Sequence, residues 1–109
     1  MSTFGALISA ARKKKGLSQK ELASRVKKQE KEEESISAQY LNDIEHDRRR
    51  PPSEHIIAQL ATELGLSKER LCLIAGTLPA RDQATISNAQ PEIVESAWKA
   101  FRRNIRHNP

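Results

Sequence analysis

GLSQKELASRV at residues 16–26 and ISAQYLNDIE at residues 36–45 are the two stretches that decide the fold. In the first, Ser18 and Glu21 have the spacing of a capping box, in which each side chain accepts a hydrogen bond from the backbone of the other residue. A helix is therefore predicted to begin near Gln19. Its inward face carries small or medium apolar side chains: Leu22, Ala23 and Val26.

The second stretch predicts a helix from about Ala38 to His46, with Leu41, Ile44 and part of Tyr40 turned inward and polar residues on the other faces. The apolar residues of both helices are small enough for a close approach, which would fix the angle between the helices. Such a pair suits DNA recognition, because one helix must enter the major groove while the other braces it against the backbone.

Three further helices complete a predicted all-α domain of five helices over residues 1–78. Each combines apolar residues at helical spacing with an end signal: Gly16 stops the first helix, and Ser53 and Ser67 cap the fourth and fifth. The single cysteine, Cys72, stands among apolar neighbours and is expected to be a small buried side chain.

Composition limits what the chain can be. With 109 residues and 37% hydrophobic content, it can bury one modest core. Its 19 Lys and Arg against 14 Asp and Glu give a net charge of +5, which favours a polyanionic partner such as nucleic acid or an anionic membrane surface. No apolar stretch approaches the roughly 18 residues that span a bilayer, and the N-terminal residues do not read as a secretory signal. We therefore expect a cytoplasmic protein.

Three segments, GLSQKELASRV, ISAQYLNDIEHDRRRPPSE and LGLSKERL, resemble in order and residue type the phage-repressor-like helix-turn-helix regulators, the Xre or lambda Cro/repressor family. The resemblance covers about residues 4–78 and implies a five-helix, lambda-repressor-like DNA-binding domain. One departure stands out. The turn between the two helices usually has one residue in this family, whereas residues 27–35, KKQEKEEES, put nine residues there.

This insertion in the helix-turn-helix turn is compatible with the fold, because lengthening a loop costs only on the order of 1 kcal/mol of closure entropy. Its polar sequence predicts either an extension of the preceding helix, in which Lys28 and Glu32 could pair, or a solvated loop. We expect its acidic end to point away from DNA or toward a protein partner, since phosphates repel carboxylates.

The resemblance also implies roles for individual residues. The major-groove positions would be Ser37, Ala38, Gln39, Asn42 and Asp43. Gln39 and Asn42 are the best candidates for base readout, because a carboxamide can pair bidentately with adenine. Asp43 would accept a hydrogen bond from cytosine or pair with an arginine. Phosphate contacts are expected from Ser18, Gln19, Tyr40, Arg48, Arg49 and Arg50.

Glu45 is expected to make a structural salt bridge or to cap the following loop, because a carboxylate facing phosphates is repelled. After residue 78, the stretch 79–90 is polar and lacks periodicity, so a linker is predicted there. Pro91 then begins an amphipathic helix within residues 91–109. Its apolar stripe consists of Ile93, Val94, Ala97, Trp98, Phe101 and Ile105.

A helix of about 15 residues is marginal in water on its own, so this stripe is expected to pack against something. Docking on its own domain, homodimerisation and binding of another protein all remain open at this point. Catalytic motifs and metal-ligand spacings are missing from the sequence, so we expect no enzyme activity, metal or cofactor. The sequence thus predicts a transcriptional regulator that binds double-stranded DNA, acting as a homodimeric repressor on a palindromic operator. The alternative is an antitoxin-like interaction protein whose DNA binding is autoregulatory.

Overall fold

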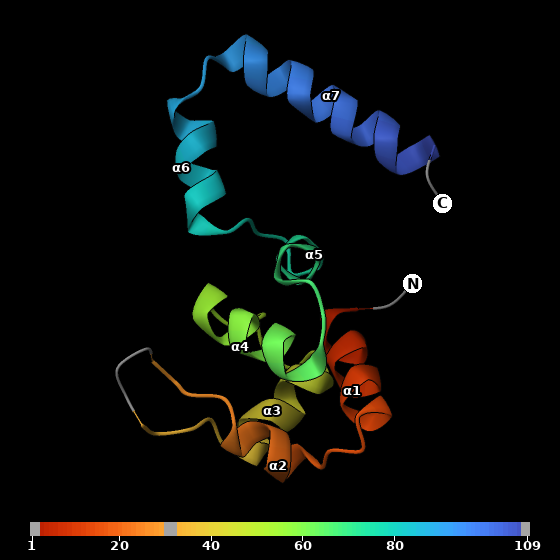
Figure 1. Cartoon of the computed structure of the whole chain (residues 1–109), viewed down its shortest axis with the longest axis vertical. Coiled ribbons are helices and arrows are strands. Elements are labelled where there is room, and N and C mark those ends of the chain that lie inside the picture. The colour runs from red at the N-terminus through yellow and green to blue at the C-terminus, as the bar shows by residue number, and fades with distance from the viewer. Residues whose placement is uncertain (1–2, 30–32, 108–109) are drawn as a thin grey trace. The chain divides into compact units, whose positions relative to one another are not determined.

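The computed structural model describes residues 3–29 and 33–107 and contains the five predicted helices in its first part (Figure 1). The chain divides into two compact units, Met1–Leu78 and Pro79–Pro109. The first unit contains α1 (Phe4–Lys14), α2 (Gln19–Ser24), α3 (Ala38–Glu45), α4 (Glu54–Leu64) and α5 (Lys68–Ile74). The second contains α6 (Ala80–Asn88) and α7 (Pro91–His107). The prediction of an all-α fold with a C-terminal amphipathic helix is confirmed.

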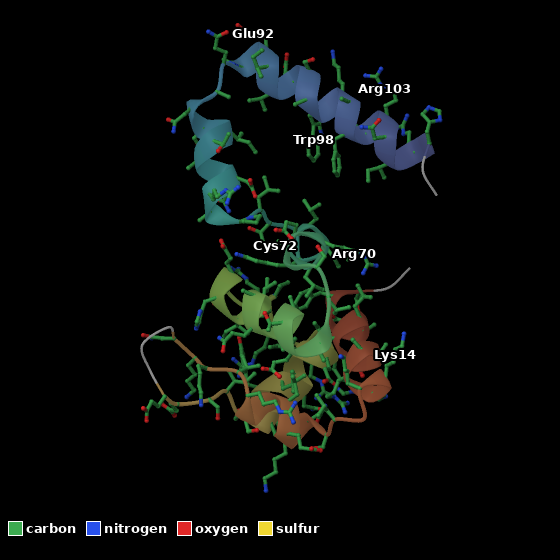
Figure 2. The ribbon with its side chains drawn as sticks, viewed as in Figure 1. Lys14, Arg70, Cys72, Glu92, Trp98 and Arg103 are labelled. Carbon is green, nitrogen blue, oxygen red and sulfur yellow. The ribbon has the colours of Figure 1, made fainter. Side chains whose placement is uncertain are left out.

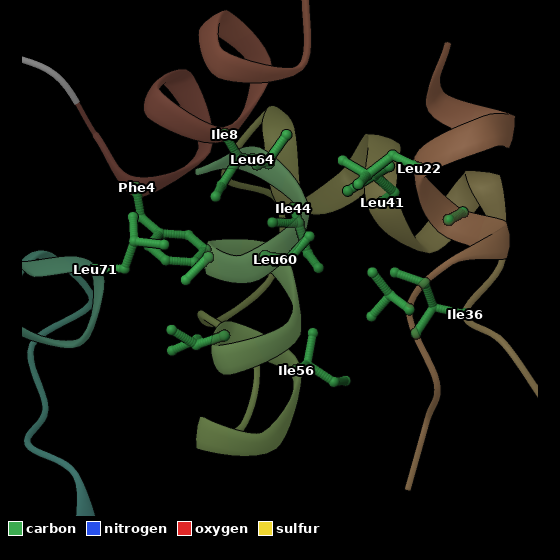
Figure 3. Close-up of a cluster of buried hydrophobic side chains, with 14 of the residues drawn as sticks. Phe4, Ile8, Leu22, Ile36, Leu41, Ile44, Ile56, Leu60, Leu64 and Leu71 are labelled. Carbon is green, nitrogen blue, oxygen red and sulfur yellow. The ribbon is translucent and has the colours of Figure 1, made fainter. Parts of the chain in front are cut away.

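One hydrophobic core holds the first unit together. α3 packs against both α1 and α2, and α4 packs against α1 and α5. Figure 3 shows Leu22 of α2 and Leu41 of α3 lying together in this core, and both side chains are fully buried. Cys72 is also fully buried, as its apolar neighbours predicted. The contact between α2 and α3 fixes the orientation of α3, whose outer face stays exposed.

Side-chain caps define where α2, α3 and α5 begin. Ser18, Ser37 and Ser67 each accept a hydrogen bond from the backbone N–H three residues later, and Ser18 with Glu21 forms the predicted capping box. Ser53 precedes α4 in an extended conformation, but its side chain makes no capping hydrogen bond. Gly65 ends α4 with a φ of 68°, a left-handed conformation that glycine adopts without steric cost.

The described ends of the insertion, residues 27–29 and 33–35, are paired with each other, and the alternative of an extension of the preceding helix is wrong. α2 stops at Ser24, and an antiparallel bridge joins Lys27 to Ser35. The side chain of Gln59 in α4 accepts from the Lys27 backbone N–H at 2.7 Å and donates to the Lys27 carbonyl at 2.8 Å. Lys28 pairs with Glu34 at 2.9 Å. The partner expected for it, Glu32, lies outside the described residues.

Within the stretch 79–90, where a polar linker without periodicity was predicted, Ala80–Asn88 form a helix, α6, that was not predicted. All nine of its residues are exposed, so this helix lacks the buried apolar stripe on which the prediction depended. The start of α6 is set locally instead: the backbone N–H groups of Asp82 and Gln83 both donate to the carbonyl of Pro79. In the described part of the chain, no helix is both long and apolar enough to cross a membrane.

Candidate nucleic-acid interface

The outer face of α3 carries the residues predicted to face the major groove. Ser37 and Gln39 are exposed, and Ala38, Asn42 and Asp43 are partly exposed. Leu41 and Ile44 on the opposite face are buried, so the helix is held by one side and open on the other. The structure therefore places all five predicted readers on one accessible surface.

A buried ion pair between α1 and α3 holds this helix in place. Nε of Arg12 in α1 donates to Oε2 of Glu45 at 2.7 Å, and its Nη2 donates to Oε1 at 2.9 Å, a bidentate arrangement. The side chains are only 11% and 2% exposed. Arg12 also donates to the Leu17 carbonyl at 2.8 Å, before α2 begins. One guanidinium thus ties α1 to α3 and to the segment before α2.

The pKa values of the two partners reflect this pairing. The pKa of Arg12 is raised, chiefly by its hydrogen bond to Glu45. Burial, the largest single influence on Glu45, raises its pKa, but the hydrogen bonds from Arg12 and Gln19 outweigh it, so the pKa lies below the ordinary value. Glu45 is therefore a charged structural residue, as expected from the sequence. The sequence did not predict that Arg12 is its partner.

Gln19 connects the ion pair to Asn42 on the exposed face of α3. Its Nε2 donates to Oε1 of Glu45 and to Oδ1 of Asn42, both at 3.0 Å. A carboxylate only accepts hydrogen bonds, so Gln19 must turn its NH₂ group toward Glu45. The same NH₂ group then fixes the amide of Asn42 with its carbonyl toward Gln19, which leaves the Asn42 NH₂ as donor. In this arrangement both Gln19 side-chain donors are used within the protein, and its predicted phosphate contact would come from the backbone N–H.

Asp43 lies at the centre of a second polar cluster. It accepts from Nε2 of Gln39 at 3.0 Å and pairs with Arg49 at 3.3 Å and with Arg48 at 3.8 Å. The Arg49 guanidinium also lies over the ring of Tyr40, 5.3 Å from its centroid. Of the two expectations for Asp43, the arginine partner is the one that the structure contains. Both arginine side chains remain 59% exposed and point away from the core.

The end of α3 is joined to the start of α1 through Asp47, a second contact that sequence reasoning missed. Asp47 has a φ of 56° and accepts from Oγ1 of Thr3 at 2.6 Å and from the Gly5 backbone N–H at 3.0 Å. A Cβ atom on Gly5 would lie 2.3 Å from the carbonyl oxygen of Ile44. Only glycine permits this approach of the two backbones.

The comparisons with known proteins agree with this geometry. Residues 5–76 match the model of a family described as a helix-turn-helix domain. The chain belongs to this helix-turn-helix family. A solved structure of a SinR protein/SinI protein complex contains a chain with a similar fold, with a TM-score of 0.53 and 21% sequence identity, over 94% of this chain and 99% of that one. No curated protein matches the sequence.

The helix-turn-helix domain therefore confirms the resemblance to phage-repressor-like regulators, and the protein is a DNA-binding transcriptional regulator. Its α2 and α3 are the two helices of the motif, and the insertion separates them. The individual contacts to bases and phosphates stay predictions. The structure adds Arg12 and Asp47 as residues that hold the motif together.

α7, in the second unit, carries the predicted apolar stripe. Ile93, Trp98 and Ile105 are 59%, 48% and 61% exposed. The rings of Trp98 and Phe101 stack with centroids 5.0 Å apart, and the Arg102 guanidinium lies 6.0 Å from the Trp98 centroid. Figure 2 shows Trp98 and Arg103 on opposite sides of this helix. The stripe thus exists as predicted, whereas its role as a dimer or partner interface stays a prediction.

Proposed function

We propose that this protein is a repressor that binds a palindromic operator in double-stranded DNA as a homodimer. The observation that carries the proposal is the open face of α3. Gln39 and Asn42 lie on it, Arg48 and Arg49 pair with its Asp43, and a buried ion pair holds the helix in place. Carboxamides read base edges and arginines bind phosphates. Rigid support matters because base readout requires a defined position of the helix.

The proposal assigns base readout to the outer face of α3 and phosphate binding to its surroundings. Gln39 and Asn42 carry most of the discrimination, with Ser37 and Ala38 closer to the start of the helix. Asn42 would present its NH₂ group, since Gln19 occupies its carbonyl. That orientation favours acceptors such as N7 of a purine. The phosphate contacts come from Ser18, the Gln19 backbone, Tyr40, Arg48, Arg49 and Arg50.

A homodimer is proposed because one recognition helix reads only a few base pairs, and a two-fold dimer doubles the length of the site. A symmetric dimer also requires a symmetric site, which is the reason for a palindromic operator. The exposed apolar stripe of α7 supports the dimer, since a contiguous apolar surface of this kind is costly to leave in water.

Selection of bound sites from a random duplex pool, followed by two variants, tests the readout. Gln39→Ala is expected to relax base preference at one position in each half-site, at a cost of about 1–3 kcal/mol on the selected sequence. Arg49→Ala is expected to weaken selected and random duplexes together and to lower the salt slope by about one. Arg70→Ala, on exposed α5 surface, is the matched control for loss of charge.

Equal losses on selected and random duplexes for both variants would refute the assignment of Gln39. The selected sites should show two inverted half-sites, and a single asymmetric half-site would contradict the homodimer. The sign of regulation is tested by placing the selected site over a promoter that drives a reporter. Repression by the protein is expected, and activation would refute the repressor role.

The alternative function, an antitoxin-like partner with autoregulatory DNA binding, is favoured by one observation. The solved structure with the similar fold is a complex between two different proteins, SinR and SinI. Under this alternative, the α7 stripe would bind another protein, and the free chain would be monomeric. Sedimentation of the purified chain distinguishes the two functions, since the proposed repressor is dimeric without a partner.

A further inference from the structure

The apolar residues of α7 have the spacing of a coiled-coil seam. Val94, Trp98, Phe101 and Ile105 follow one another at intervals of four, three and four residues within a helix of 17 residues. This alternation places one side chain per turn along a single line, the pattern through which two helices interdigitate. The seam is largely exposed, with Trp98 at 48%, Phe101 at 37% and Ile105 at 61%.

The charges of α7 are separated along its length. Glu92 and Glu95 precede Trp98, and Lys99, Arg102, Arg103 and Arg106 follow it. This separation agrees with the dipole of the helix, which favours acidic residues early and basic residues late. It also decides between two ways of pairing two copies. Parallel helices would place like charges side by side, whereas antiparallel helices place the acidic half of each against the basic half of the other.

The seam and the charges agree on one antiparallel register. When Trp98 of one copy is level with Phe101 of the other, Val94 is level with Ile105, so all four seam positions are paired. Glu95 and Arg102 both flank the seam on the same edge. In an antiparallel pair these edge positions face each other across the interface, so each Glu95 faces an Arg102 of the other copy, twice by symmetry.

The position of Arg102 in the free helix supports this register. Its guanidinium lies over the Trp98 ring, 6.0 Å from the centroid, and is therefore held at the border of the seam. Arg103 lies on the opposite side of the helix from Trp98 (Figure 2). Of these two neighbouring arginines, only Arg102 is placed to meet a carboxylate across the interface.

We propose that α7 pairs antiparallel with α7 of a second copy, with two Glu95–Arg102 ion pairs that fix the orientation. This inference rests on the proposed homodimer and names the contact that makes it. The partner is a second copy because the acidic and basic halves of this one helix complement each other only when the helix meets itself in reverse.

Charge exchange in the full-length chain tests the inference. Glu95→Arg alone and Arg102→Glu alone should each raise the dissociation constant of the dimer by at least about tenfold, because two attractive pairs become repulsive. An equimolar mixture of the two variants should recover the dimer, since both pairs in the heterodimer again join opposite charges. Arg103→Glu, the same charge change outside the seam, is the matched control. Sedimentation equilibrium measures the constants, and circular dichroism verifies that each variant is helical.

The possible outcomes separate this inference from the homodimer itself. Recovery in the mixture supports the antiparallel register. A dimeric wild type whose variants do not recover on mixing overturns the register and leaves the homodimer standing. A monomeric wild type overturns both. The fluorescence of Trp98, the single tryptophan of the chain, then shows whether α7 is shielded by its own chain or open to another protein.

Discussion

Removal of the Arg12 side chain is expected to destabilise the first unit by about 3 kcal/mol. Breaking a buried ion pair by removing one partner costs about 3–5 kcal/mol, because the remaining charge stays buried without compensation. The Glu45 side chain is 2% exposed, so this condition applies. The Arg12 side chain is 11% exposed, so the expected loss lies at the lower end of this range of free energies. Arg12→Ala also removes the hydrogen bond to the Leu17 carbonyl.

Urea unfolding followed by far-ultraviolet circular dichroism measures this change. The fluorescence of Trp98 is unsuitable, because that residue lies in the second unit. Lys28→Ala is the matched control, since its partner in the structure, Glu34, is 69% exposed and such surface pairs contribute about 0–1 kcal/mol. A loss for Arg12→Ala no larger than that for Lys28→Ala would refute the structural role of the buried pair.

The same pair predicts a dependence of stability on pH. The pKa of Glu45 in the folded protein is lowered, so folding favours the carboxylate over the protonated form. The resulting stabilisation is complete above the ordinary glutamate pKa of about 4.3 and is lost as the pH falls through the lower folded value. Glu45→Gln should therefore be less stable at neutral pH and should lose less stability on acidification. Parallel pH profiles for the two proteins would contradict the assignment.

Three further predictions follow from single contacts. Gly5→Ala should lower stability by about 1–3 kcal/mol in thermal unfolding, because its Cβ would overlap a carbonyl of α3, and an unchanged midpoint would refute this. Gln59→Ala should speed hydrogen exchange at the Lys27 amide, which it anchors, and unchanged exchange would show that the loop base is held otherwise. Asp43→Asn should tighten binding to random duplexes in gel-shift titrations by releasing Arg49, whereas a loss confined to one base position would indicate base readout instead.

Much of the candidate site was predictable because its elements are set by local sequence. Ser18 and Glu21 form the capping box that their spacing predicted, and α3 begins after Ser37 as expected. The outer face of α3 follows from the burial of Leu41 and Ile44 alone. α6 was missed for the converse reason: it forms without a buried stripe, so periodicity gave no signal.

The contacts that support the site were not predictable, because their partners are far apart in the sequence. Arg12 is the first of four consecutive basic residues in the sequence, yet it reaches Glu45 across 33 positions. A signal was present in retrospect. Arg12 follows the fully buried Ile8 by four residues, and Glu45 follows the fully buried Leu41 by four. Positions one helical turn after a core residue are themselves turned inward, and opposite charges there can satisfy each other.

The sequence by itself determined the five helices of the first unit, the side-chain caps of α2 and α5, and the exposed face of α3, because these depend on interactions within a few residues. Tertiary structure decided how the polar side chains are used. It turned the Gln19 amide toward Glu45 and thereby oriented Asn42, and it placed Asp43 between arginines. The hydrogen-bond partner of a polar side chain is whichever group lies next to it once the core has formed. Position in the sequence does not specify that partner.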